Sequence, residues 1–143
     1  VREFSRLVEG LQARLAQNPD DLQGWVLLGR TLGFLDEFEA AGRALREALR
    51  HGGDRDPEVL VRYADVLAEI EGTLEGEPAA LIEQALAIDP ENAQGLWLAG
   101  TRAYQAGAHE EARAYWERLL AVLPEGTAEA EVIRGNLMQL QQP

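Results

Sequence analysis

The residues that could perform chemistry are few in this sequence, and their spacing does not assemble a reactive site. Histidine occurs only as His51 and His109, and cysteine is absent, which excludes thiolate nucleophiles, disulfides and cysteine metal ligands. The segment "HEEAR" that starts at His109 lacks the second histidine of the zinc protease motif. Its acids Glu110 and Glu111 are adjacent and diverge on a helix, which is poor geometry for acid–base catalysis. We expect a protein that is not an enzyme and that carries no cofactor or metal.

The charge of the chain argues against nucleic acid as a partner. All 13 basic residues of the 143 are arginine, and 25 acidic residues bring the net charge to −12. Such a surface repels phosphate backbones. The segment "GTLEGEP" from Gly72 to Pro78 also lacks the lysine and the strand that a phosphate-binding loop requires. No apolar run approaches the roughly 18 residues of a membrane span, so we expect no membrane contact by this segment.

Two segments of equal length, Gly24 to Leu49 and Gly95 to Leu120, repeat one pattern of small and large residues. Superposing them places Gly29 on Gly100, and both segments carry an alanine twelve residues later, Ala41 in the first. Apolar residues recur at spacings of three and four in both, which predicts helices with one buried face. The small residues are expected where two antiparallel helices cross, because a larger side chain would hold the backbones apart.

The repeat has a period of 34 residues, the distance from Pro90 to Pro124. This period and its landmarks resemble the tetratricopeptide repeat, a helix pair that stacks into a superhelix with a concave, peptide-binding wall. We therefore predict an all-α tetratricopeptide superhelix in one domain, residues 1–143, with about three helix pairs and flanking helices at both ends. The expected parts are an N-terminal helix at 2–17, repeats at 22–56, 57–92 and 93–126, and a capping helix at 127–140.

The middle repeat departs from the pattern in the connection between its two helices. An extended loop at 71–77 makes it about two residues longer than the period permits. Pro78 fits the first turn of the following helix, where its missing N–H costs nothing. At the helix-to-helix turns of the outer repeats, Gly107 and Asp36 are suited to left-handed backbone, the aspartate less well than a glycine.

Several phrases resemble one group within the tetratricopeptide superfamily. They are the glycine-rich loop "GTLEGEP" together with "NPDDLQGWVLLGR", "DPEVLVRYADVLA", "ALAIDPENAQGLWLAG" and "AYWERLLAVLP". The chain is similar, over roughly residues 5 to 135, to the periplasmic repeat domain of the cytochrome c maturation subunit. That subunit presents apocytochrome to the haem-attachment machinery, and the group includes a nitrite-reductase-specific relative.

The resemblance implies a binding module for the C-terminal helical segment of an apocytochrome c. Its further implied partners are other cytochrome c maturation and haem lyase subunits, and its implied location is the periplasm. Members of the group have a membrane-anchored N-terminal part, and a start at Val1 instead of methionine leads us to expect that this part is missing here. The alternative is a generic repeat scaffold that assembles a protein complex without preference for apocytochrome.

In such repeats, positions 2, 5, 9, 12 and 13 line the concave wall, because helical spacing places them on one face. The mixture of aromatic, aliphatic and charged residues there suits an amphipathic helix lying in a groove. The residues that we predict to bind the peptide are Val26, Arg30, Phe34, Val61, Asp65, Gln94, Trp97, Thr101 and Tyr104.

Two of these residues leave alternatives open. Trp97 stands one residue after the usual large core position, Leu96, and one helical step turns it about 100° toward the groove. The alternative is that Trp97 packs against the C-terminal capping helix. Arg30 is suited to a ligand carboxylate through its planar guanidinium, but it could equally pair with Asp65 on the neighbouring helix.

Overall fold

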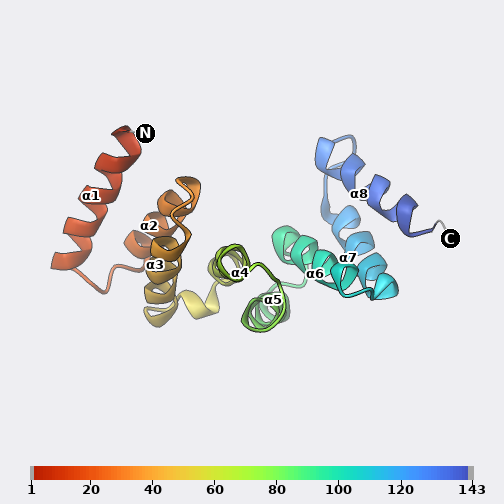
Figure 1. Cartoon of the computed structure of the whole chain (residues 1–143), viewed down its shortest axis with the longest axis horizontal. Helices are drawn as coiled ribbons and strands as arrows, with labels where there is room; N and C mark the ends of the chain where they lie inside the picture. Colours follow the sequence, from red (N-terminus) through yellow and green to blue (C-terminus); the bar gives the residue numbers. More distant parts are fainter. Residues whose placement is uncertain (1, 142–143) are drawn as a thin grey trace.

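The computed structural model describes residues 2–141, and within that range every regular element is helical. The helices follow one another along the long axis in chain order, with the two termini at opposite ends (Figure 1). This confirms the predicted all-α repeat fold. The elements are α1 (Arg2–Gln17), α2 (Leu22–Phe34), α3 (Phe38–Arg50), the 3-10 helix η1 (Gly53–Arg55), α4 (Pro57–Glu71), α5 (Glu77–Ile88), α6 (Ala93–Gln105), α7 (His109–Val122) and α8 (Ala128–Leu140).

The first helix of each repeat begins at an acidic or amide cap. The side chain of Asp21 accepts a hydrogen bond from the backbone N–H of Gly24 at 3.0 Å, and Asn92 accepts the equivalent bond at the start of α6. Asp56 caps α4 in the same way. These side chains satisfy backbone donors that have no partner inside the helix, so the sequence fixes where each first helix begins.

The turns adopt the conformations that their residues predict. Asp36 is left-handed at φ 60°, and Gly107 has φ 79°. Pro78 lies in the first turn of α5, so the insertion of the middle repeat is confined to residues between α4 and α5. The short helix η1, which follows the left-handed Gly52, was not expected from the sequence.

Each helix pair is held by a large residue of the second helix packed on a small residue of the first. A Cβ atom on Gly29 would lie 2.6 Å from Leu45 Cγ, and one on Gly100 would overlap the indole of Trp116. In the middle repeat, Ala64 takes the place of the glycine. These small residues are buried, so they set the distance between α2 and α3 and between α6 and α7.

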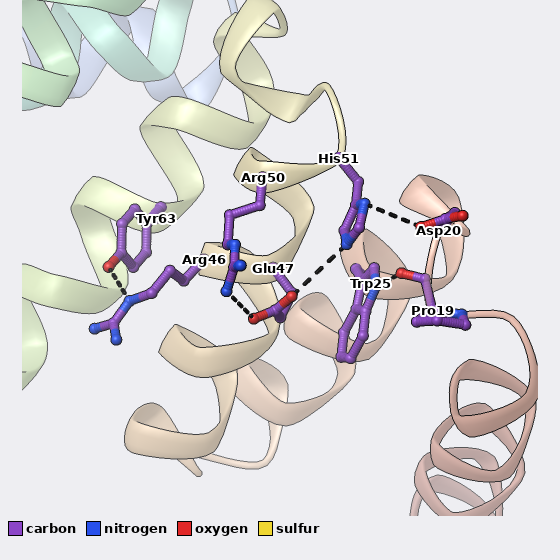
Figure 2. Close-up of polar contacts among 8 residues, drawn as sticks. All are labelled: Pro19, Asp20, Trp25, Arg46, Glu47, Arg50, His51 and Tyr63. Atoms are coloured by element: carbon purple, nitrogen blue, oxygen red, sulfur yellow. Dashed lines mark hydrogen bonds and ion pairs between the residues drawn. The ribbon is translucent and has the colours of Figure 1, made fainter.

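Polar contacts join neighbouring repeats. The Asn92 side chain donates to Glu58 Oε1 at 2.7 Å, across a separation of one repeat. Arg46 of α3 donates to the hydroxyl of Tyr63 of α4 at 3.3 Å (Figure 2). Asn92 is buried, so without its bond to Glu58 the side-chain amide would lose a hydrogen bond, whereas the exposed Glu58 could bond to water instead.

The N-terminal helix is tied to the first repeat through the loop that follows it. Trp25 donates from its indole N–H to the carbonyl of Pro19 at 2.8 Å (Figure 2). His51, at the end of α3, lies 3.6 Å from a carboxylate oxygen of Asp20 and 3.7 Å from one of Glu47. The ends of α1 and α3 are therefore held together beside the start of α2.

The crossing of α6 and α7 predicts a sharp effect of one methyl group. Gly100→Ala should lower the free energy of unfolding by about 1–3 kcal/mol, because the added Cβ forces Trp116 out of its place. Chemical denaturation measures this. Gly10→Ala is the matched control, since a Cβ there meets nothing within 4 Å inside α1, and it should stabilise by about 0.5–1 kcal/mol. Equal effects at both positions would contradict the proposed role of the crossing.

Candidate functional site

Among the cavities that the first helices of the repeats border, two are lined by residues predicted to bind the peptide. One, here called the α2–α4 cleft, has a volume of 570 Å³ and receives residues from α1 to α4. The other, the α6–α8 pocket, has a volume of 310 Å³ and receives residues from α6, α7 and α8. Figure 1 shows α2 toward the N-terminal end of the row, α4 in its middle and α8 at the C-terminal end. A ligand following the first helices could therefore contact both.

The α2–α4 cleft combines four exposed apolar side chains with four charged ones. The apolar ones, here called the apolar shelf, are Phe4, Leu7, Leu27 and Phe34. The shelf includes Phe34, whose side chain is 71% exposed and whose ring lies 4.8 Å from that of Phe4. An exposed aromatic pair is unusual unless something covers it. The residues lining the cleft are Phe4, Leu7, Leu27, Gly29, Arg30, Thr31, Gly33, Phe34, Phe38, Arg62, Asp65, Val66 and Glu69.

The charges of the cleft perturb one another. Partial burial raises the pKa of Asp65 above its usual value, the adjacent Glu69 raises it further, and Arg62 opposes both. Burial also lowers the pKa of Arg62, and the positive charge of Arg30 adds to that lowering. Asp65 is partly buried whereas Arg62 is exposed, and perturbed charges that line a cleft mark candidate functional positions.

The α6–α8 pocket is mainly apolar and has Trp97 in its wall. Its residues are Ala93, Gln94, Trp97, Leu119, Leu123, Glu129, Val132 and Ile133. Val132 is 55% exposed and stands at the surface of α8, whereas Ile133 is buried. The pocket can accept an apolar side chain, with Gln94 and Glu129 as the polar groups of its lining.

Aromatic rings connect this pocket to the core of the third repeat. Trp97 stacks on Trp116, with ring centroids 5.9 Å apart and planes at 22°. Trp97 is partly buried and also shares the pocket with residues of α8. Trp97 thus packs on the core and borders the pocket that α8 completes, and its contact with a ligand stays a prediction. Tyr104 is 45% exposed and stacks on His109 at 5.4 Å.

The structure corrects the prediction for Val61. Its side chain is only 1% exposed and belongs to the main hydrophobic core, so it cannot contact a ligand from the groove. The reason is that α4 is the central first helix, with packed neighbours on both sides. The position of Val61 in the repeat predicted an accessible side chain because it does not take the neighbours of α4 into account.

The other predicted residues divide between the two cavities. Arg30, Phe34 and Asp65 line the α2–α4 cleft, and Gln94 and Trp97 line the α6–α8 pocket. Val26 is partly buried and borders neither. The remaining two are Thr101, whose hydroxyl donates to the Trp97 carbonyl of its own helix at 2.8 Å, and Tyr104. Within residues 2–141, Arg30 and Asp65 form no ion pair with each other.

Sequence reasoning missed Arg62, which stands at repeat position 6. Leu27 and Leu98 occupy this position in the other two repeats, so a charged residue there was the available signal. The sequence offered the capping helix as an alternative packing partner of Trp97, but it did not predict that Val132 and Ile133 of α8 would form the wall of a pocket beside that residue.

Comparison with known proteins places this geometry in a family. The model of the family described as "Cytochrome c-type biogenesis protein H TPR domain" matches residues 1–130. The chain belongs to this family. It is 33% identical to the cytochrome c-type biogenesis protein CycH of Pseudomonas aeruginosa over 99% of the chain. It is 30% identical to CcmH of Escherichia coli K12 over 98% of the chain.

The chain spans 37% and 40% of the lengths of those two family members. A further relative is the formate-dependent nitrite reductase complex subunit NrfG of Escherichia coli O157:H7, 25% identical over 79% of the chain and 57% of that protein. The resemblance drawn from the sequence motifs is thereby confirmed. Within residues 2–141, no helix combines the length and the apolar character needed to cross a membrane.

Two crystal structures of MamA share the fold. Their TM-scores are 0.77 and 0.78 at 14% identity, and each alignment covers 96% of this chain. The alignments include 84% and 79% of the MamA chains. At this identity, the similarity concerns the arrangement of helices and carries no information about ligands.

The raised pKa of Asp65 predicts that replacing its ionised side chain with a neutral one will stabilise the fold. Because its folded pKa is raised, the ionised carboxylate destabilises the fold at neutral pH, and this penalty disappears as pH falls toward the ordinary value of 3.8. Asp65→Asn should therefore raise the melting temperature at pH 7, and its advantage over the parent should shrink as the pH is lowered. The melting temperatures of the parent and of Asp65→Asn, measured from pH 4 to 7 in steps of about one pH unit, test this. A lower melting temperature at pH 7 would contradict the assignment.

Proposed function

We propose that this domain binds the C-terminal helical segment of an apocytochrome c and holds it for haem attachment. It acts in the periplasm, together with other cytochrome c maturation or haem lyase subunits, and contributes binding instead of catalysis. Support comes from its membership of a cytochrome c-type biogenesis family and from the two cavities that its first helices border. The observation that carries the proposal is the apolar α6–α8 pocket with Trp97 in its wall.

An amphipathic helix is the ligand that best fits this surface. Such helices dock by placing a few large apolar side chains into pockets of a groove, and aromatic anchors supply much of the binding energy. The α6–α8 pocket offers Trp97, Val132 and Leu123 as contacts for one such side chain. The exposed shelf at Phe34 and Phe4 offers a second apolar contact at the other end.

A binding role also agrees with the chemistry of the side chains that line both cavities. They are aliphatic, aromatic, amide, arginine and carboxylate groups and the hydroxyl of Thr31, which donates a hydrogen bond to the Leu27 carbonyl of its own helix. Such a set can anchor apolar side chains and pair with charges. Neither cavity presents a nucleophile hydrogen-bonded to a base, the arrangement on which covalent catalysis depends.

Calorimetric titration of the 143-residue chain with a peptide copying the C-terminal helix of an apocytochrome c tests the proposal. Scrambled and C-terminally amidated peptides are the controls. We expect binding of the native sequence in preference to the scrambled one, and a loss on amidation would assign a contact to the terminal carboxylate. Equal affinity for native and scrambled peptides would instead favour the generic repeat scaffold.

The α6–α8 pocket predicts which substitutions weaken that binding. Trp97→Ala should reduce peptide affinity by at least about tenfold, because it removes an aromatic anchor. Trp97 also stacks on the core, so Val132→Glu is the second variant, placing a charge at an exposed rim without disturbing packing. Ile88→Ala, at an exposed site on α5 outside both cavities, is the matched control.

Circular dichroism must show that the variants remain folded. If Val132→Glu and Ile88→Ala both bind the peptide as the parent does, the peptide does not use the α6–α8 pocket.

A further inference from the structure

Helix α8 forms one wall of the α6–α8 pocket, although little of the helix is buried. Of its 13 residues, only Ala130 and Ile133 are buried, and both lie in its first half. In the second half, Leu137 and Leu140 are partly buried and pack on the core of the third repeat. By contrast, α6 on the other side of the pocket buries six residues. The second half of α8 is therefore the part of the pocket wall with the least packing.

Arg113 of α7 reaches the end of this second half. Its Nη2 atom donates a hydrogen bond to the backbone carbonyl of Leu140 at 3.3 Å, across 27 residues of sequence. Its Nη1 atom donates to Glu110 Oε1 at 3.0 Å, three residues earlier on α7. The Nε atom of Arg113 is buried. Within residues 2–141, the bond to Leu140 is the only hydrogen bond that joins α8 to another helix.

The chemistry of a helix end explains why this contact holds α8. The last four carbonyls of an α-helix have no partner within the helix, and that end carries a partial negative charge. A cation placed there is stabilising, and it can donate to the free carbonyls. α8 has no basic residue in its own last turn. Arg113 supplies this cation from the neighbouring helix.

Other arginines with the same local pairing do not make such a link. Arg50 lies 3.2 Å from Glu47, and Arg134 lies 2.6 Å from Glu131, each three residues away on its own helix. In the described part of the chain, neither of these guanidinium groups bonds to a second helix. Pairs along an exposed helix surface contribute little to stability, so the bond to Leu140 is what distinguishes Arg113.

We propose that Arg113 is a positioning residue for the α6–α8 pocket. It holds the end of α8 against α7, and this keeps Val132 and Ile133 of α8 in the pocket wall. Arg113 itself does not line the pocket. The inference rests on the proposed function and adds to it a residue that changes peptide affinity without touching the peptide.

The other two walls of the pocket do not depend on this bond. α6 contributes Trp97, and α7 contributes Leu119 and Leu123. These two helices are fixed to each other where Trp116 packs on Gly100. A pocket whose third wall is displaced for part of the time binds its ligand more weakly, because the apparent affinity falls with the population of the complete pocket.

Hydrogen exchange of the backbone amides in the 143-residue chain tests the Arg113–Leu140 bond without any peptide. Arg113→Ala should speed exchange in the second half of α8 about three- to tenfold. Exchange in α2 and α4 should stay at the parent rate, which also shows that the variant is folded. Arg113→Lys should restore part of the protection, since its ammonium group keeps a positive charge beside the helix end.

Two matched controls separate this bond from the local ion pair. Glu110→Gln removes the acidic partner of Arg113 on α7 but leaves the donor to Leu140. Arg50→Ala removes an ion pair of the same spacing from α3. Exchange in α8 should stay within about twofold of the parent in both variants.

Calorimetric titration with the apocytochrome c C-terminal peptide then connects the bond to the candidate site. Arg113→Ala should weaken binding at least about threefold, and Arg113→Lys should weaken it less. Glu110→Gln and Arg50→Ala should stay within about twofold of the parent. In a chain that already carries Val132→Glu, Arg113→Ala should weaken binding less than it does alone, because both changes act on the same wall.

The outcomes separate this inference from the proposed function. If Arg113→Ala leaves exchange in α8 at the parent rate, or if Arg50→Ala speeds it equally, the inference is wrong whether or not the peptide binds. If α8 exchanges faster in Arg113→Ala but the peptide binds this variant as tightly as the parent, Arg113 does not position the site and the proposed function stands. A parent chain that binds no peptide would overturn the proposed function, and the positioning role with it.

Discussion

The close approach of the two helices within each repeat is the constraint on which the rest of this structure depends. Gly29 and Gly100 leave no room for a Cβ atom beneath Leu45 and Trp116, and these contacts set how each pair crosses. In the middle repeat, the buried Ala64 stands at the position of these glycines, and Ile82 stands where the other repeats have Leu45 and Trp116. Because each repeat contacts mainly its neighbours, the geometry of each pair propagates along the row.

In the third repeat, the close approach of the two helices also determines the position of a residue in the candidate site. Trp116 is buried against Gly100, and Trp97 stacks on Trp116 from the same side of α6. The position of Trp97 in the α6–α8 pocket therefore depends on a glycine that no ligand touches. The helix α8 completes the pocket, so one element both ends the superhelix and forms part of the candidate site.

In the α2–α4 cleft, by contrast, a charged residue that lines a candidate site lowers the stability of the domain. Partial burial and the charge of Glu69 raise the pKa of Asp65 and Arg62 opposes this, so the ionised carboxylate of Asp65 costs some stability in the free domain. The tightly packed core of the repeats can carry this cost, since small residues at the crossings allow dense packing.

The sequence by itself determined the helices, their pairing and the family. Caps such as Asp21 and Asn92 and the left-handed Gly107 act locally, and the 34-residue period with its small residues is read directly along the chain. Only the tertiary structure decided which residues of the first helices remain accessible. Val61 is buried because α4 has neighbours on both sides, and Arg62 of α4 and Arg30 of α2 line one cleft. Helical periodicity defines a direction around one axis, whereas accessibility and charge contact depend on the distance and twist between helices, which are set by packing among many side chains.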